Sequence, residues 1–512
     1  MSAILMLFCA AMAAYDNTVV FSQDFSDPET SPRSPAKLVK EDGRTCLRID
    51  KVDFEKSATV HIPLDAQQIA GQLVTARAIL KASGVSEPPN SWNGIKIMLV
   101  LQKDGDTVYP QMPMPAGTFE WRNAVETIRV PTGIHSAHLV LGLEKVSGTV
   151  WFDSVELRLG RPADKRRRSE TPFRGHDLPR LRGAMHGPHF HEPNVRDLGI
   201  IWNANHVRWQ LNWTPMKKAE EWAKNLEEYD TWLDGALEQF DQALPACEKY
   251  GLVVLLDLHT PPGGRAEHGV CRMFSEPKYQ DQLVAVWQRI ARRYKGNEVI
   301  YAYDLLNEPV EGPIPEGMTD WREIATRVAR AIREIDPGKP VLFEPGPWGS
   351  PTGFDRLIPL DVEHVIYGFH MYLPHAFTHQ GVHGSPVGLT YPGEISGEFW
   401  DKERLRQAIL PAIEFQREFN IHIHVGEFSA IRWAPDHSAY RYLRDVIELF
   451  EEYGWDWTYH AFREWDGWSV EHGPEPEDKE RAETPTKRQE LLLEWFAKNE
   501  KPAWFRGKQP GK

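Results

Sequence analysis

The feature that most constrains the fold is a repeat of apolar strands, each followed by an amphipathic helix, in the chain beyond Leu181. Gly251 to Leu258 forms a nearly continuous apolar run, and a helical pattern follows it from Tyr279 to Tyr294. A second apolar run, Val299 to Tyr303, precedes a helical pattern from Trp321 to Ile335. Strands that are apolar on both faces and alternate with helices are typical of a parallel sheet covered by helices.

Eight such strands predict a closed (β/α)₈ barrel. Their predicted ends lie near Met185, Arg208, His259, Asn307, Glu344, His370, Glu427 and Phe462. Eight strands within about 320 residues suit a barrel of this kind. A doubly wound open sheet is the alternative, but no glycine-rich phosphate loop follows the first strand.

The chain before the barrel has a different pattern, which predicts an all-β, jelly-roll-like sandwich. Short β-rich runs recur between turn residues, and they include Thr59 to Ile62, Ile95 to Val100, Ala137 to Leu141 and Gly148 to Leu157. The last run resembles the closing strand of jelly-roll carbohydrate-binding modules. We expect this unit to bind glycan through Trp92 or Trp121, or else to be a spacer that binds no sugar.

These patterns divide the chain into four segments. Residues 1–13 are a candidate signal peptide, because an apolar run ends in Ala11-Met12-Ala13, although the segment contains no Lys or Arg. Residues 14–160 are the sandwich, residues 161–179 a polar and basic linker, and residues 180–505 the barrel. The expected location is therefore secreted or periplasmic.

The charge of the chain limits its partners. A net charge of −14 would be repelled by nucleic acid and by anionic membranes, so we expect neither as a partner. Cys46, Cys247 and Cys271 follow the predicted cleavage site at wide spacings, which indicates neither a disulfide framework nor a zinc site. No obligate protein partner is evident, and a neutral substrate is expected.

Two carboxylates stand where barrel chemistry is expected. Glu308 follows the fourth strand in Leu306-Asn307-Glu308-Pro309, and Glu427 ends the seventh in Val425-Gly426-Glu427-Phe428. The active sites of such barrels lie at the carboxyl ends of the strands, so the two side chains can face each other across the mouth. Cleavage of a glycoside needs that arrangement of two carboxyl groups.

These motifs resemble those of glycoside hydrolase family 5 and, more broadly, the clan A (β/α)₈ glycosidases, which include cellulases and mannanases. The resemblance extends over residues 181–496. The matching positions, in chain order, are Arg208, His259, Asn307, Glu308, His370, Tyr372 and Glu427. The resemblance implies a retaining β-glycoside hydrolase that acts on a β-glycan by double displacement.

The resemblance also implies a role for each residue. Glu427 is the nucleophile, and Glu308 is the general acid/base, which must carry its proton when the substrate binds. Arg208 and Tyr372 donate hydrogen bonds to Glu427 and hold its pKa low. The substrate-binding positions implied in this way are Arg208, His259, Asn307, His370 and Tyr372, and Asn307 bonds the sugar 2-hydroxyl.

The end of the eighth strand departs from the family, which usually has a Trp there as the floor of the subsite where the bond breaks. In this chain the sequence is His460-Ala461-Phe462-Arg463-Glu464-Trp465. We expect Trp465 to be the platform, with Phe462 or Trp468 as alternatives, and Glu464 to bind substrate. Sugar preference stays open: β-1,4-glucan is the first expectation and β-mannan the second.

Two histidine groups introduce an alternative class of enzyme. The first group is His375, His379 and His383, and the second is His186, His189 and His191; imidazoles at such spacings can ligate zinc. Pro374, Gly381 and Gly384 interrupt the first group, so we expect no metal and no other cofactor. A metal-assisted barrel hydrolase and a carbohydrate-binding protein with an inactive barrel are the alternatives.

Overall fold

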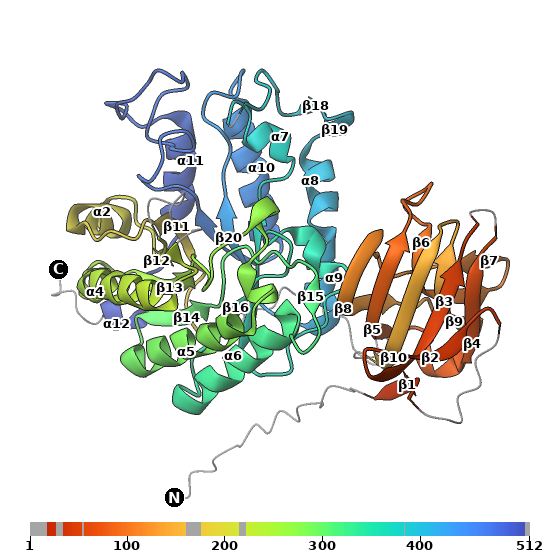
Figure 1. Cartoon of the computed structure of the whole chain (residues 1–512). Coiled ribbons are helices and arrows are strands. Elements are labelled where there is room, and N and C mark those ends of the chain that lie inside the picture. The colour runs from red at the N-terminus through yellow and green to blue at the C-terminus, as the bar shows by residue number, and fades with distance from the viewer. Residues whose placement is uncertain are drawn as a thin grey trace, which may run out of the picture. The chain divides into compact units, whose positions relative to one another are not determined.

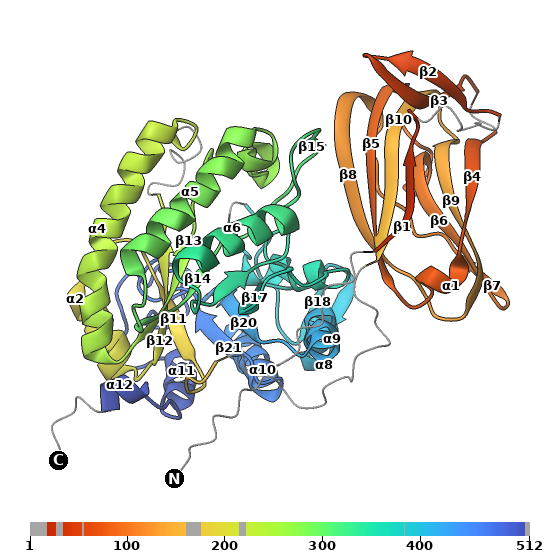
Figure 2. The same cartoon turned by 90° about the horizontal axis from the view of Figure 1, so that it is seen from below.

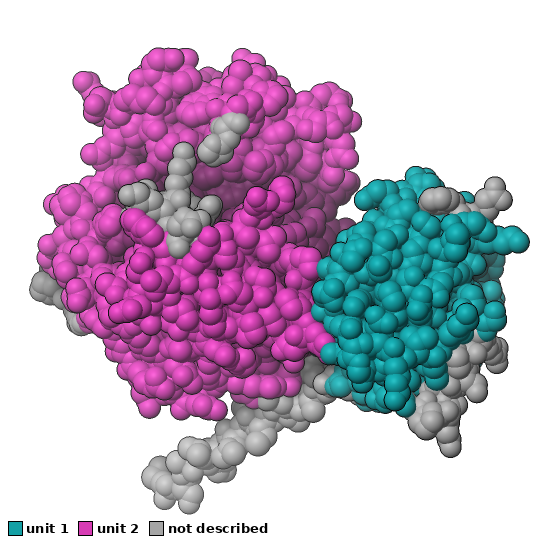
Figure 3. Space-filling view, viewed as in Figure 1, with its two compact units in different colours: residues 1–166 teal, residues 167–512 magenta. Residues whose placement is uncertain are grey.

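The computed structural model describes residues 18–26, 34–53, 56–159, 176–213, 222–382 and 384–506. The chain divides into two compact units, Met1–Arg166 and Arg167–Lys512, which Figure 3 distinguishes by colour. The predicted signal peptide, residues 1–13, lies outside the described residues, as does the predicted linker up to residue 175. Within the described ranges, no helix is long and apolar enough to cross a membrane.

The first unit is a sandwich of antiparallel sheets (Figure 1). One sheet contains, in order, β8 (Gly117–Arg129), β5 (Leu73–Val85), β10 (Gly148–Leu159), β3 (Arg44–Lys51) and β2 (Lys37–Glu41), and β1 (Val19–Asp24) also pairs with β10. The other sheet contains β4 (Ala58–Leu64), β9 (Ile134–Glu144), β6 (Gly94–Lys103) and β7 (Asp106–Val108), and a short helix, α1 (Ala66–Ile69), follows β4. The predicted all-β sandwich is confirmed.

Alternation along the strands explains why the two sheets stack. In β5, Ala76, Ala78, Leu80 and Ala82 are buried, and the residues between them are half-buried. Neighbouring side chains of a strand point to opposite faces, so one face of each sheet is apolar. The buried apolar residues of both sheets form a single core, which includes Leu80, Phe152, Ile97, Leu99, Leu139 and Leu141.

The second unit contains the predicted closed parallel barrel. Its strands, in order around the barrel, are β11 (Arg182–His186), β12 (His206–Leu211), β13 (Val253–Leu258), β14 (Ile300–Asp304), β16 (Val341–Phe343), β17 (Val365–Met371), β20 (Ile423–Phe428) and β21 (Asp456–Tyr459). Pairing of β21 with β11 closes the ring. β13 is buried along its whole length, so the apolar side chains on both of its faces are removed from water.

Helices surround the barrel, as the view in Figure 2 shows. The longer ones are α4 (Leu226–Tyr250), α5 (Pro277–Tyr294), α6 (Trp321–Ile335), α9 (Leu410–Phe419), α10 (Ser438–Glu452) and α11 (Lys487–Phe496). Shorter elements are α2 (Glu192–Arg196), a π-helix (Asp197–Ile201), β15 (Ile314–Pro315), α7 (His375–Thr378), the hairpin β18 (Gly393–Ile395) and β19 (Glu398–Trp400), α8 (Lys402–Ala408) and α12 (Ala503–Arg506). The helix predicted from Trp321 to Ile335 has the bounds of α6. The helix predicted from Tyr279 to Tyr294 starts two residues later than α5.

Local signals set the ends of the longest helix, α4. The side chain of Asn225 accepts hydrogen bonds from the N–H groups of Glu227 and Glu228, which have no partner within the helix. Gly251 ends the helix with φ of 73°, a left-handed conformation that glycine adopts without strain. The helix therefore ends at a defined residue, and the chain reverses its direction there to enter β13.

A buried carboxylate closes the amino end of the barrel. Asp456 Oδ2 lies 2.6 Å from His176 Nε2 and 2.8 Å from His422 Nε2, and Oδ1 accepts the N–H of Leu181 at 2.8 Å. Burial alone would raise the pKa of Asp456, but His422 and His176 hold it well below its ordinary value. His176 falls within the predicted linker, yet it packs against the barrel.

We predict that Asp456→Asn destabilises the barrel by about 3–5 kcal/mol, because the two histidines lose their buried charged partner. The advantage of the wild type is present above the ordinary pKa of an aspartate, near 3.9, and is lost as the pH falls through the lower pKa of the folded state. Urea unfolding at several pH values checks both statements. Asp355→Asn, at an exposed position, is the control, and equal unfolding midpoints for the two variants would contradict the prediction.

Candidate active site

A cavity of about 1180 Å³ opens at the carboxyl ends of the barrel strands. Every strand end contributes a lining residue: His186, Gln210, His259, Glu308, Trp348, Tyr372, Glu427 and His460. Loops at this end of a parallel barrel carry the polar groups, because the strands below them are filled with apolar side chains. The cavity is therefore the candidate active site.

Arg208 lies beneath the cavity, at the centre of an ion cluster. Its side chain is fully buried in the middle of β12, rather than at the strand end that the sequence analysis predicted. The guanidinium bonds Glu427 Oε1 at 2.7 Å and Asp304 Oδ2 at 2.9 Å. It also lies 3.1 Å from Glu344 Oε1 and 3.2 Å from Asp257 Oδ1. One cation thus ties together residues of five strands or strand ends.

The carboxylates around Arg208 differ in the direction of their pKa shifts. Burial raises the pKa of Asp304 well above its ordinary value, although Arg208 acts to lower it. Burial would do the same to Glu344, but the positive charges of His370 and Arg208 keep the pKa of Glu344 below its ordinary value. The positive charges beside Glu344 thus offset the effect of burial, which prevails at Asp304.

Glu427 is held as an anion by donors on three sides. Besides Arg208, the hydroxyl of Tyr372 donates to Oε2 at 2.9 Å, and His460 Nδ1 lies 3.1 Å from the same oxygen. Burial would raise the pKa of Glu427, but the charges of His370, His460 and Arg208 lower it well below its ordinary value. An ionised carboxylate at the floor of a cavity can act as a nucleophile.

Glu308 is held in a strained conformation beside the cavity. Its φ is 46°, in the left-handed region, which is costly for a residue with a side chain. The N–H of Glu308 donates to Glu344 Oε2 at 2.9 Å, and Arg265 donates to the carbonyls of Glu308 and Asn307 at 2.9 and 2.8 Å. These bonds fix the turn after β14 and direct the side chain into the cavity.

The two catalytic candidates lie close together. One side-chain oxygen of Glu308 and one of Glu427 are within 4.8 Å of each other. His370 Nδ1 lies between them, 2.9 Å from Glu308 Oε1 and 3.7 Å from Glu427 Oε2, and its Nε2 is 2.9 Å from Glu344 Oε1. The charges of Glu344 and Glu427 outweigh burial and raise the pKa of His370 well above its ordinary value.

The remaining predicted positions also line the cavity. Asn307 accepts a hydrogen bond from Arg208 at 3.1 Å through Oδ1, which leaves its amide nitrogen free to donate to a bound molecule. His259 Nδ1 lies 2.8 Å from Asp257 Oδ2, and this contact fixes the imidazole at the end of β13. The structure therefore brings together all the positions that the family resemblance indicates on strands two, three, four, six and seven.

At strand eight the lining differs from the expectation. Trp465 does not belong to the cavity lining, whereas the alternatives Phe462 and Trp468 do. The ring of Trp465 packs edge-on against Trp468 at 5.1 Å and against Trp433 at 6.4 Å. Trp468 stacks on Tyr372 at 5.0 Å, and it is the indole after strand eight that lines the cavity.

The sequence analysis missed Glu344 and His460 as members of the catalytic cluster, and it expected Glu464 to bind substrate. Glu344 was noted only as a strand end, although it bonds Arg208, His370 and the N–H of Glu308. His460 and Glu464 form a contact of 3.2 Å beside Glu427. Their positions at the ends of strands five and eight were the available signal.

The described members of the two histidine groups line the same cavity, but none of them lies in a group of three side chains close enough to share a metal ion. His375 and His379 stack face to face at 3.8 Å, and His186 stacks on Trp209 at 4.6 Å, while His383 lies outside the described residues. Within the described part of the chain, the side chains grouped closely enough to share a metal ion are Glu308, His370 and Glu427, and separately His176, His422 and Asp456. Hydrogen bonds already connect the members of both groups.

Comparisons with known proteins concern the barrel. A family model described as Cellulase (glycosyl hydrolase family 5) matches residues 168–466. Endoglucanase C of Acetivibrio thermocellus is 31% identical over 284 residues, covering 50% of this chain and 80% of that protein. Cellodextrinase A of Ruminococcus flavefaciens is 25% identical over 265 residues, covering 49% and 73%. A solved structure titled as a glycoside hydrolase has a TM-score of 0.50 at 24% identity and covers 62% of this chain and 99% of that one, which shows a shared fold.

We predict that Arg208→Met lowers the free energy of unfolding by about 3–5 kcal/mol, because it leaves several buried carboxylates without their cation. Arg330→Met is the matched control, since Arg330 forms a 2.7 Å pair with Asp361 and both side chains are 58% exposed. Exposed pairs contribute less than about 1 kcal/mol. Urea unfolding of both variants checks the difference, and equal losses would show that the cluster does not stabilise the barrel.

Proposed function

Because the chain belongs to glycosyl hydrolase family 5, we propose that it hydrolyses β-1,4-linked glucan with net retention of configuration at the anomeric carbon. The chain is a glycoside hydrolase, and the names of its relatives, endoglucanase and cellodextrinase, support glucan as the substrate. The observation that carries the mechanism is the separation of the carboxyl oxygens of Glu308 and Glu427, within 4.8 Å. Retaining enzymes hold their carboxyl groups about 5–5.5 Å apart, whereas inverting enzymes need about 6.5–9.5 Å to admit a water molecule.

In the first proposed step, Glu308 gives its proton to the glycosidic oxygen while an oxygen of Glu427 attacks the anomeric carbon. The glycosidic bond breaks, the leaving sugar departs as an alcohol, and a glycosyl ester forms on Glu427. In the second step Glu308 takes a proton from water, and the water oxygen displaces Glu427. Both carboxyl groups return to their starting states.

The neighbouring residues support these steps. Arg208 binds one oxygen of Glu427 and Tyr372 the other, so the attacking carboxylate keeps its charge and its orientation. Arg208 also fixes Asn307, whose amide is placed to donate to the sugar 2-hydroxyl as charge develops at the anomeric carbon. His370 contacts Glu308 and is suited to orient the acid. Trp468 and His259 complete the walls around the sugar.

We predict that Glu427→Ala lowers turnover of the preferred glycan by at least about 10⁴-fold, because it removes the nucleophile. Added azide is expected to restore turnover of an activated aryl glycoside by the variant and to give an α-glycosyl azide, since the small anion attacks from the vacated face. The measurement is product analysis by nuclear magnetic resonance. Release of sugar from β-glucans, mannans and xylans by the wild type identifies the substrate.

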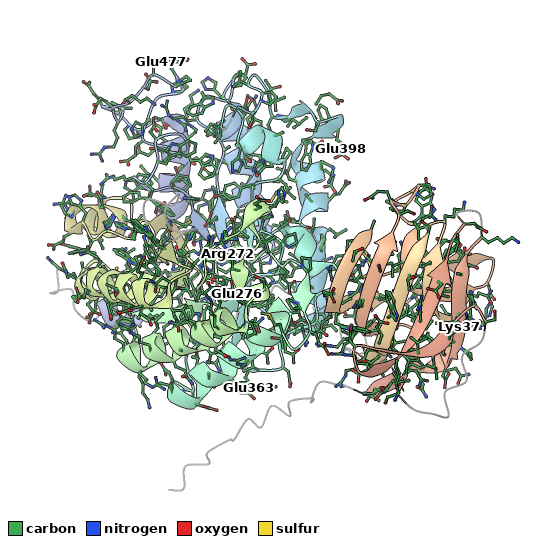
Figure 4. All side chains as sticks on the ribbon, viewed as in Figure 1. Lys37, Arg272, Glu276, Glu363, Glu398 and Glu477 are labelled. Atoms are coloured by element: carbon green, nitrogen blue, oxygen red, sulfur yellow. The ribbon has the colours of Figure 1, made fainter. Side chains whose placement is uncertain are left out.

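Glu398→Ala is the control for this experiment. Its side chain is 56% exposed on β19, far from the cavity lining, and Figure 4 labels it on the outer surface of the barrel unit. Activity of Glu427→Ala equal to that of this control would overturn the mechanism.

Other outcomes would favour the alternatives. If the wild type prefers mannan, the second expected substrate takes the place of glucan. Loss of wild-type activity on chelation would favour the metal-assisted alternative, and binding without hydrolysis would favour an inactive barrel.

For the sandwich we propose glycan binding through Trp92. This side chain is 62% exposed, and Tyr109 is a second exposed aromatic residue at 59%. Tyr109 stands two residues before Gln111, whose amide donates to the carbonyl of Trp92 at 3.2 Å. Trp121, the other candidate, is occupied: its indole N–H donates to Asp42 at 2.9 Å, and Arg44 lies 4.9 Å from its ring centre. An exposed indole face stacks well on the apolar face of a pyranose.

We predict that Trp92→Ala weakens binding of the inactive Glu427→Ala chain to insoluble cellulose by about tenfold, because one stacking face is lost. Phe399→Ala is the control, since Phe399 is 56% exposed on the barrel unit. A sedimentation binding assay gives the dissociation constants. Identical constants for the three proteins would favour the spacer role for the sandwich.

We also propose that the enzyme acts outside the cytoplasm. A polysaccharide substrate supports this location, because a polymer of that size does not diffuse across a membrane. Antibody detection of the protein in culture medium, periplasm and cell lysate tests the proposal.

A further inference from the structure

His460 occupies a place between two carboxylates that the proposed mechanism does not use. It follows β21, its side chain is 18% exposed, and it lines the cavity. Nδ1 lies 3.1 Å from Glu427 Oε2, and Nε2 lies 3.2 Å from Glu464 Oε2. Glu464 is itself fixed by Gln210, whose amide donates to Oε1 at 2.8 Å.

These contacts favour a doubly protonated imidazole. Ionised carboxylate oxygens accept hydrogen bonds and have no proton to give, so a hydrogen on each ring nitrogen satisfies the contacts with both Glu427 and Glu464. Tyr372 is compatible with this arrangement, because its hydroxyl donates to Glu427 at 2.9 Å while its oxygen accepts from Nδ1 at 2.7 Å. A neutral imidazole carries one N–H, so it would turn a lone pair either from Nδ1 toward Glu427 or from Nε2 toward Glu464.

We propose that His460, held by Glu464, is a positioning residue for Glu427 and acts as an imidazolium; this inference rests on the proposed function. It keeps Oε2 of Glu427 directed toward the anomeric carbon before the first step. In the second step Glu427 leaves the sugar and regains its negative charge, and the fixed imidazolium stabilises that charge as it develops. The tryptophan that the family usually has at the end of strand eight carries no charge, so it would offer Glu427 at most one N–H.

The pH dependence follows from the groups around the ring. These are Glu427 on β20, Tyr372 and His379 after β17, and Glu464 after β21. Burial would lower the pKa of His460, but the charges of Glu427 and Glu464 raise it to about 9. The imidazolium is therefore present below about pH 9 and is lost as the pH rises through that value.

The test uses the full chain and 2,4-dinitrophenyl β-cellobioside, whose leaving group needs no proton from Glu308. We expect kcat/KM of the wild type to fall above about pH 9. Glu464→Gln is expected to move this fall about one pH unit lower, because the imidazole loses one of its two anionic partners. His460→Gln is expected to lower kcat/KM about 10²-fold, because Oε2 of Glu427 loses the contact that directs it toward the anomeric carbon, and to abolish the fall.

His364→Gln is the matched control. His364 lies 3.6 Å from Glu363, as His460 lies beside Glu464, but it is 55% exposed, and Figure 4 labels Glu363 at the periphery of the barrel unit. Its pH profile is expected to equal that of the wild type. An unchanged fall in Glu464→Gln together with near-wild-type kcat/KM in His460→Gln would overturn the inference.

A second measurement needs no turnover. Nuclear magnetic resonance of the protein labelled with ¹⁵N-histidine, with His460→Gln used to assign the signal, reports the protonation of each ring nitrogen. We expect both nitrogens of His460 to be protonated at pH 7, and a neutral tautomer would overturn the inference even in an active enzyme. Failure of the proposed function is distinct, since it requires a wild type that cleaves none of the glycans.

Discussion

The arrangement of the barrel mouth depends on the buried cation of Arg208. A guanidinium has donors on several edges, and here they reach carboxylates of β13, β14 and β20 and of the segment after β16. Placing this charge inside a protein is costly unless its partners surround it. The cluster therefore requires the closed ring of strands, because only closure brings residues separated by more than two hundred positions into contact.

The same cluster sets the chemistry of the cavity. Positive charge from Arg208, His370 and His460 surrounds Glu427 and keeps it ionised despite burial. Asp304 and Glu344 lie deeper, where burial raises the pKa of Asp304 and pairing with His370 lowers that of Glu344. The catalytic carboxylates are thus the members of a larger charge network that face the cavity, and their reactivity is a property of the network.

Strand eight shows how far a family resemblance extends. The motifs on strands two, three, four, six and seven lie where the resemblance implies, because each is a short run whose backbone position is fixed by its own strand. The loop after β21 has no such constraint: Arg463 bonds Asp197 at 2.8 Å and Glu471 at 2.9 Å, and Trp465 turns toward Trp433. Its side chains depend on distant partners, so Trp468 rather than Trp465 faces the cavity.

The sequence by itself determined the classes of structure and the approximate positions of the barrel strands, although Arg208, a predicted strand end, lies in the middle of β12. Period-two runs before residue 160 and alternating strands and helices after Leu181 record which faces must be buried, and burial is the dominant force in both units. The two catalytic candidates followed from their positions at strand ends. Only the tertiary structure decided the partners of Arg208, the separation of Glu308 and Glu427, and the contact of His460 with Glu464. These depend on distances between side chains of different strands, which no local pattern encodes.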